Sequence, residues 1–268
     1  MIIERNKISA IRNLPSGTFA IPNLEWSLEP GGLSEISGEG PRSMITMLIK
    51  RGFKEHITNL LAENVLQNLQ DFGTQTFNEL ERVILDRIEE YVSRIKSGRQ
   101  ISDAEITTIV CGIHIWGGRT GRNLFVMGNK FPGNFSFPDY RKMISAILEP
   151  NEQRAIEALQ LGNFSQFGTA YATKHLAFWT KSPQVGIKLP IFDSIINRIV
   201  FGENGTPSFR NYTHYLSRMK QAARQINQLN PTFQGQYHVH HLERQLFDWN
   251  NTEPSLCKQW QKIRTGER

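Results

Sequence analysis

Two residues carry the chemistry that this sequence suggests first, a lysine and an aspartate. Lys174 lies in the apolar stretch YATKHLAFW, and Asp193 follows nineteen residues later, directly after Pro190, Ile191 and Phe192. A neutral lysine amine can attack an electrophilic carbon and form an imine, and an ionised carboxylate stabilises positive charge that develops during a reaction. The pair therefore predicts covalent chemistry with a lysine nucleophile.

Lys174 is expected near the start of a helix that ends near Trp179, among the apolar residues Leu176, Ala177 and Phe178. The positive end of a helix dipole disfavours an ammonium group at such a position. This favours the neutral amine that imine formation requires. The alternative is a lysine that lies along a surface helix with its charge in water, and the residue alone does not separate the two.

Asp193 precedes the apolar residues Ile195 and Ile196 and is expected to cap the amino end of a helix over residues 194–201. A capping carboxylate has a structural role and needs no other. A carboxylate held by backbone amides is also ionised and fixed, as a group that faces a developing oxocarbenium ion must be. The two roles are compatible, so the spacing of the pair carries the functional argument.

This pattern resembles a known family. A lysine near a helix start, followed about nineteen residues later by an aspartate after a proline-containing apolar segment, is similar to the helix-hairpin-helix DNA glycosylase superfamily. The similarity is greatest to its 8-oxoguanine glycosylase branch and the prokaryotic OGG-fold proteins within it. It covers about residues 160–202, and the stretch WGGRTGRN at 116–123 resembles the same group.

The resemblance implies a DNA N-glycosylase that flips a damaged or modified nucleotide out of the duplex, with Lys174 as nucleophile and Asp193 as the stabilising carboxylate. The imine permits β-elimination at the abasic site, so AP-lyase activity is expected as well. The excised base is either 8-oxoguanine, which implies DNA repair, or a phage-type base such as glucosylated hydroxymethylcytosine, which implies antiviral defence. No cofactor is expected.

Two other classes of function remain open. The chain could be a non-catalytic DNA-binding protein that keeps the same scaffold to recognise modified or distorted DNA. It could also be a helical regulator that binds duplex nucleic acid by sequence and does not depend on Lys174.

Base flipping requires further side chains that fill the gap, hold the base and contact phosphates. Trp116 and the loop after it, with Arg119, Arg122 and Asn123, are candidates for DNA binding, although a structural loop packed by Trp116 would look the same. On a helix, Phe178 and Trp179 point in different directions, so one of them is expected in the core. The candidate residues for DNA binding or base recognition around the lysine are Tyr171, Thr173, His175, Phe178 and Trp179.

The charge of the chain is unevenly distributed. The 268 residues have a formal net charge of +6, made up of −3 over residues 1–111, +4 over 112–146, 0 over 147–204 and +5 over 205–268. Basic segments bind a polyanion through phosphate contacts, and the neutral segment between them contains the candidate site. Duplex DNA with a flipped modified base is the expected partner, and a basic surface without that role is the alternative.

The hydrophobic pattern predicts a mainly α protein with a helix-hairpin-helix glycosylase-like fold, two helical subdomains and the active site in the cleft between them. The expected parts are an irregular N-terminal arm over 1–40, a helical subdomain over 41–150 with a DNA-contacting loop at 116–137, and a catalytic helical subdomain over 151–268. Helical patterns cover 41–61, 74–97, 102–116 with a capping box from Ser102 to Glu105, 139–148, 152–161, a segment ending near Trp179, 194–201, 209–228 and 238–250.

Several kinds of site and location are not indicated. Cys111 and Cys257 form no metal or disulfide motif, and His238, His240 and His241 have a spacing that does not converge on one metal ion, so no metal site is expected. The sequence has no apolar run of 18 residues, and its first residues lack the apolar core of a signal peptide. A cytoplasmic monomer without membrane contact is therefore the expectation.

Overall fold

The protein is mainly α-helical, as the hydrophobic pattern predicts. The computed structural model describes residues 39–118, 135–161, 168–201, 207–229 and 237–252, and these residues form helices and no strand. Nearly all of the expected N-terminal arm at 1–40 and most of the expected loop at 116–137 lie outside the described residues.

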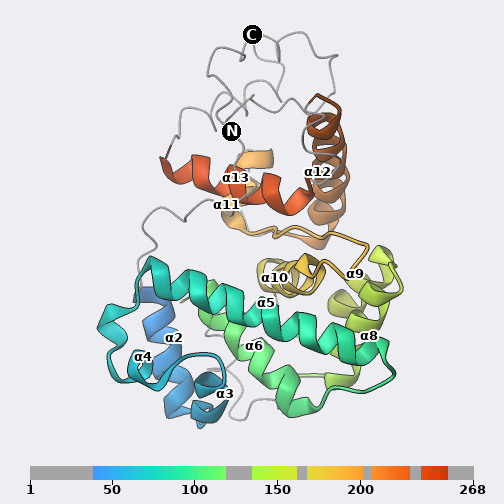
Figure 1. Cartoon of the computed structure of the whole chain (residues 1–268). Coiled ribbons are helices and arrows are strands. Elements are labelled where there is room, and N and C mark those ends of the chain that lie inside the picture. The colour runs from blue at the N-terminus through green and yellow to red at the C-terminus, as the bar shows by residue number, and fades with distance from the viewer. Residues whose placement is uncertain (1–38, 119–134, 162–167, 202–206, 230–236, 253–268) are drawn as a thin grey trace. The chain divides into compact units, whose positions relative to one another are not determined.

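The described residues form two compact units (Figure 1). One unit lies within Glu35–Leu189, and the other begins at Pro190. The first unit contains α2 (Glu39–Lys50), α3 (Lys54–Thr58), α4 (Glu63–Gln67), the 3₁₀ helix η2 (Leu69–Asp71), α5 (Thr74–Lys96), α6 (Asp103–Gly117), α8 (Phe137–Leu148), α9 (Glu152–Leu161) and α10 (Thr169–Lys181). The second contains α11 (Ser194–Phe201), α12 (Phe209–Leu229) and α13 (Val239–Thr252). The subdomain boundary predicted at residue 150 stays a prediction.

Two helices, α6 and α10, form the centre of the first unit. Helix α6 packs against α2, α3, α5 and α10, and α10 also packs against α5, α8 and α9. Every residue from Ile106 to Ile115 on α6 is buried, as is every residue from Tyr171 to Thr180 on α10. A helix that is buried on all sides belongs to the core, so the polar side chains that these two helices carry are enclosed by protein.

The start of α6 follows the predicted capping box. The Glu105 amide donates to the Ser102 hydroxyl at 3.2 Å, and the Ser102 amide donates to the Glu105 carboxylate at 2.7 Å. These two bonds satisfy amides that the first turn of a helix leaves without partners. The Arg94 guanidinium from α5 forms an ion pair with the same carboxylate. The prediction for this helix start is confirmed.

The helical pattern over residues 41–61 is divided in the structure. Helix α2 ends at Lys50, and Gly52 then adopts a φ of +88°, which lies outside the helical region and which glycine tolerates best. The chain resumes as the short helix α3. The apolar spacing continues across this turn, so periodicity alone does not reveal the break.

The second unit is built around aromatic side chains. Helix α13 packs against both α11 and α12. The Phe192 ring stacks on Tyr215 at 4.8 Å between centroids and lies 6.1 Å from the Tyr212 ring. The Tyr212 hydroxyl donates to the Pro190 carbonyl at 3.1 Å. The chain that leads into α11 is therefore anchored to α12.

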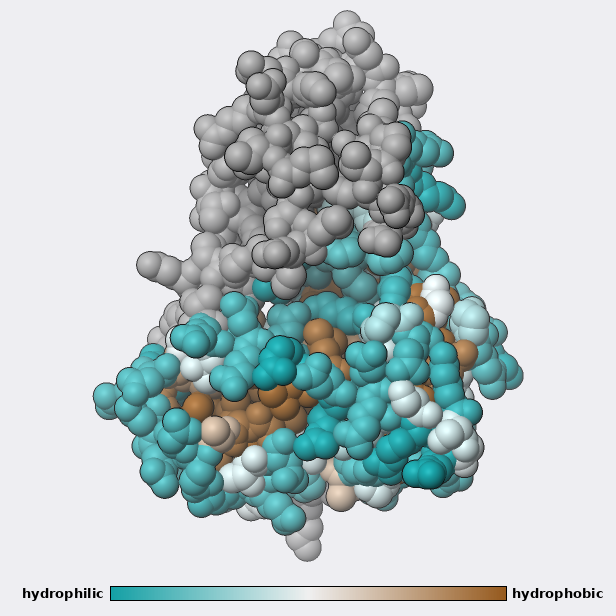
Figure 2. Space-filling model, viewed as in Figure 1, coloured by the Kyte–Doolittle hydropathy of each residue, from teal (hydrophilic) through white to brown (hydrophobic). Residues whose placement is uncertain are grey.

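The outer face of α5 is polar. Figure 2 shows hydrophilic side chains over most of the face that this helix presents in the view.

Among the described residues, every helix is too short or too polar to cross a membrane.

Candidate functional site

Lys174 lies inside the first unit. Its side chain is 7% exposed on α10, and its Nζ lies 4.9 Å from the centroid of the Tyr171 ring. The alternative of a surface lysine with its charge in water is therefore wrong for this residue. Lys174 follows Thr169, the first residue of α10, by five positions, so it lies beyond the first turn, where the helix dipole acts most strongly. The main features of its surroundings are therefore burial and the Tyr171 ring, and the helix dipole contributes less.

Tyr171, one turn before Lys174, is held on three sides. Its ring stacks on His114 of α6 with 4.5 Å between centroids and 19° between planes. Its hydroxyl donates to the Gly118 carbonyl at 3.2 Å. A Cβ added to Gly117 would lie 2.8 Å from atoms of this ring, which is closer than carbon atoms approach without movement. Gly117 therefore provides the space for the ring beside which the Lys174 amine lies.

Buried polar side chains on α8 and α10 are linked by hydrogen bonds in the core. The Trp179 Nε1–H donates to the Tyr140 oxygen at 2.9 Å, and the Tyr140 hydroxyl lies 2.8 Å from His175 Nδ1. The indole can only donate, whereas the tyrosine hydroxyl can donate to Nδ1 or accept from it according to the tautomer of His175. The His175 and His114 rings lie 5.4 Å apart.

Burial keeps these linked side chains uncharged. Desolvation, followed by the proximity of His114 and of the Lys174 charge, holds the pKa of His175 well below its usual value. Desolvation also raises the pKa of Tyr140, and the hydrogen bond from Trp179 opposes this shift only in part. Both groups are neutral near pH 7, so the hydrogen-bonded side chains in this part of the core carry no charge.

The other aromatic candidates belong to the packing around α10. Phe178 and Trp179 are both fully buried, so neither presents a face on which a base could stack in this structure. Trp116 is half-buried, stacks on Phe77 at 5.4 Å and contacts Phe178 edge-on at 5.1 Å. We expected one of Phe178 and Trp179 to lie in the core, and both do.

A half-buried ion pair joins α5 to the end of α10. The Lys181 Nζ lies 2.7 Å from the Glu81 carboxylate, which also accepts the Trp116 indole N–H at 3.0 Å. The same ammonium lies over the Phe178 ring at 5.0 Å. In the sequence Glu81 looks like one of the solvated charges of α5, and nothing in its spacing distinguishes it from the others.

The other predicted residues of this region are Thr173 and three residues of the loop after Trp116. Thr173 is fully buried, and its hydroxyl donates to the Ala170 carbonyl at 3.2 Å. Arg119, Arg122 and Asn123 lie outside the described residues, and their role stays a prediction.

Asp193 belongs to the second unit and caps α11 as predicted. Its Oδ1 accepts the amides of Ile195 and Ile196, each at 3.0 Å. Its charge contributes, after burial and the charge of Glu243, to a Tyr215 pKa that lies well above the usual value. The carboxylate is half-buried and fixed by backbone donors.

Lys188 is a second enclosed amine that the sequence analysis did not single out. Its Nζ donates to the carbonyls of Thr180 and Ser182, each at 2.8 Å, at the carboxyl end of α10. Burial lowers the pKa of Lys188. The signal that could have found it is a basic residue shortly after a helix end, a common partner for terminal carbonyls.

The described residues contain no group of three or more His, Cys, Asp or Glu side chains arranged to hold a metal ion. Comparison with known proteins found no matching family model, no matching curated protein and no matching solved structure.

Proposed function

We propose that this chain is a DNA glycosylase that removes a damaged or modified base, with Lys174 as the nucleophile. The observation that carries the proposal is the enclosure of the Lys174 side chain, 7% exposed, with its amine beside the Tyr171 ring. Enclosing a lysine costs free energy because the ammonium loses its hydration. A lysine that is enclosed and oriented by an aromatic ring is suited to nucleophilic chemistry.

The proposed reaction proceeds at C1′ of a flipped nucleotide. The Lys174 ammonium first gives up a proton to solvent. The lone pair of the amine then forms a bond to C1′ while the electrons of the glycosidic bond leave with the base, which takes up the proton that the nitrogen loses. The hemiaminal opens to an imine as the ring oxygen of the sugar accepts a proton. Removal of a C2′ proton then expels the 3′ phosphate, which gives AP-lyase activity.

Asp193 is proposed to stabilise the positive charge that develops on the sugar. This role depends on its spacing from Lys174 in the sequence and on the chemistry of a carboxylate whose Oδ1 accepts two backbone amides. A carboxylate held in this way needs no rearrangement as the charge appears.

The substrate is proposed to be 8-oxoguanine or a phage-type base such as glucosylated hydroxymethylcytosine, in duplex DNA. Oligonucleotides that contain 8-oxoguanine, uracil, hydroxymethylcytosine or its glucosylated form, each incubated with the protein, would identify the base by excision. The non-catalytic alternative predicts binding to one of these duplexes without base release or an abasic product.

Borohydride reduction tests the nucleophile directly. The wild-type chain is expected to form a covalent adduct with the excised substrate, and peptide mapping is expected to find it on Lys174. The Lys174→Gln variant should form none, while Lys188→Gln, which removes another enclosed amine, should trap as the wild type does. An adduct on Lys188, or normal trapping by Lys174→Gln, would overturn the assignment.

A further inference from the structure

The exposed face of α12 differs from the charged face of α5. One side of this 21-residue helix is buried against the second unit through Tyr212, Tyr215, Leu216, Met219, Ala222 and Ala223. The opposite side repeats at spacings of three and four and is exposed or half-buried. We call it the α12 stripe, and its members are Arg210, His214, Ser217, Arg218, Gln221, Arg224, Gln225 and Gln228.

The α12 stripe consists of hydrogen-bond donors and contains no acid. The whole of α12 has four Lys or Arg residues and no Asp or Glu. Arginine, serine and glutamine side chains are among the groups that proteins use to contact phosphate oxygens. Arg210 and Arg224 are separated by about 21 Å at 1.5 Å of rise per residue. This is the rise of about six base pairs at 3.4 Å each.

Helix α5 shows what a solvated charged face looks like in the same protein. Arg82 pairs with Asp86 at 3.0 Å, and Arg87 pairs with Glu90 at 3.0 Å. These pairs are spaced by three or four residues, which stabilises a helix and neutralises its charge locally. Such a face attracts a polyanion only weakly, because its positive and negative charges cancel locally.

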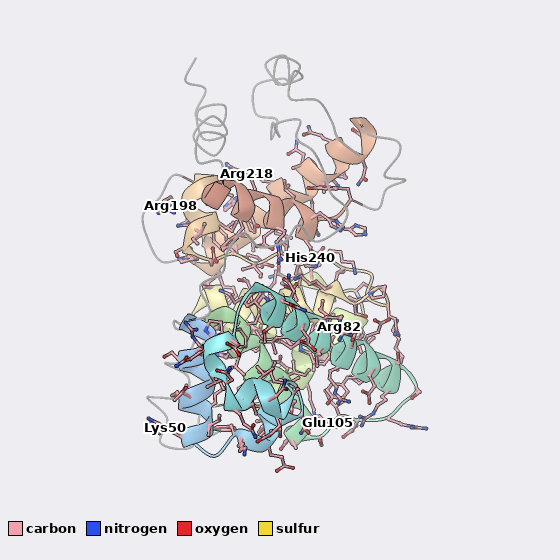
Figure 3. The ribbon with its side chains drawn as sticks, turned by 60° about the vertical axis from the view of Figure 1, so that its left-hand side comes forward. Lys50, Arg82, Glu105, Arg198, Arg218 and His240 are labelled. Carbon is pink, nitrogen blue, oxygen red and sulfur yellow. The ribbon has the colours of Figure 1, made fainter. Side chains whose placement is uncertain are left out.

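The arginines of the α12 stripe are in a different setting from those of α5. Within the part of the chain that the structure describes, none of Arg210, Arg218 and Arg224 forms an ion pair. The guanidinium of Arg218 lies over the Phe201 ring at 5.3 Å, a contact that orients the group and leaves its positive charge in place. Figure 3 labels Arg218 on α12 and Arg82 on α5, the two settings that differ.

We propose that the α12 stripe binds the phosphodiester backbone of duplex DNA. Unneutralised arginines gain affinity for DNA by releasing condensed counterions, a gain that arginines already paired with carboxylates cannot provide. The inference deepens the proposed function, because it names the surface that would hold the substrate independently of the base. Affinity through this surface does not depend on DNA sequence or on a modified base.

The test compares two triple variants that remove the same charge. One replaces Arg210, Arg218 and Arg224 by Gln, and the matched control replaces the ion-paired Arg82, Arg87 and Arg154 by Gln. Binding to an unmodified duplex is measured by fluorescence anisotropy at several salt concentrations between about 50 and 200 mM. The stripe variant is expected to bind at least about 10-fold more weakly and to lower the slope of log affinity against log salt by about 2 to 3. The control is expected to stay within about twofold of the wild type.

A conservative variant guards against a folding effect. Replacing the same three stripe residues by Lys keeps the charge and should restore most of the salt slope. Thermal unfolding of all variants checks that the second unit is intact. An equal loss in the stripe and control variants, or no loss in the stripe variant, would overturn the proposal.

Two further measurements distinguish DNA binding by the α12 stripe from the glycosylase proposal and from membrane binding. Excision and trapping by the stripe variant at saturating protein test the proposed chemistry alone, so a chain that binds DNA through the stripe but excises nothing contradicts only the glycosylase proposal. Vesicles of phosphatidylserine and phosphatidylcholine in equal amounts provide a different anionic surface. If the stripe variant lost vesicle binding while its DNA affinity were unchanged, the surface would be a membrane site and the DNA proposal would fail.

Discussion

Lys174 in the first unit and Asp193 in the second are held by different kinds of contact. Asp193 is fixed by amides two and three residues along the chain. Lys174 lies beside a ring that is itself held by residues of α6 more than fifty positions earlier, since the Tyr171 hydroxyl bonds to the Gly118 carbonyl. The carboxylate is therefore positioned by local sequence and the amine by tertiary packing. Substitutions should affect the two in different ways.

The largest effect is expected at Lys174. Replacing it by Met keeps the length of the side chain and removes the amine. Single-turnover excision should fall by about 1,000-fold or more because the nucleophile is gone. The free energy of unfolding should stay within about 1 kcal/mol of the wild type or rise, because the variant no longer encloses a group that water solvates well. Urea unfolding and excision on the same samples check both parts, and a large loss of stability would contradict this account of the site.

Two substitutions at Asp193 separate charge from capping. Asp193→Asn keeps an oxygen that can cap α11 and loses the charge, so excision should fall by about 100-fold with little change in stability. Asp193→Ala loses both and should also lower the free energy of unfolding by about 1 kcal/mol. Ser194→Ala, at the exposed next position, is the control. If Asp193→Asn excised like the wild type, Asp193 would be a helix cap only.

A smaller effect is expected when the ring beside Lys174 is displaced. Gly117→Ala places a Cβ 2.8 Å from the present position of the Tyr171 ring. Single-turnover excision should fall by about 10-fold, and the free energy of unfolding by about 1 to 3 kcal/mol, as for other overpacked sites. In the control Gly186→Ala, the nearest atom to the new Cβ is 3.8 Å away, so little should change. Unchanged excision by Gly117→Ala would show that the ring does not orient the amine.

The smallest effect concerns pH and the buried histidine. Burial holds the pKa of His175 well below its usual value of 6.5. At a pH between the folded and the usual pKa, the unfolded chain therefore binds a proton at this residue and the folded chain does not. This contribution to stability is complete above pH 6.5 and is lost as the pH falls. Between pH 6.5 and 5 the wild type should lose about 1 to 2 kcal/mol that His175→Gln does not lose. Parallel pH dependences in the two proteins would contradict it.

The helices were predictable where one face of a segment is apolar or where a cap has a short signature. The capping box from Ser102 to Glu105 and the cap at Asp193 are both local patterns, and both have the predicted bonds. The apolar spacing runs through the break at Gly52, so periodicity missed it. The signal that could have found it is a glycine directly after the basic residues Lys50 and Arg51, a common helix end.

The surroundings of Lys174 were only partly predictable for a related reason. Its burial depends on α10 packing against four other helices, and a helix that is apolar on most sides has no exposed face to indicate which residue is covered by which neighbour. His114 was not singled out, because its contacts with Tyr171 and His175 arise between helices. The ion pair of Glu81 with Lys181 joins residues one hundred positions apart, and such a pairing leaves no trace in helical spacing.

The hydrogen bond from Tyr171 to the Gly118 carbonyl ties the helix that carries Lys174 to the residue that caps the end of α6. Gly118 has a φ of +73°, so the chain turns sharply where that bond is made. The carboxyl end of α6 therefore works as a mechanical stop for the Tyr171 ring. A shift of this end would move the ring beside the Lys174 amine without breaking any backbone hydrogen bond inside α10.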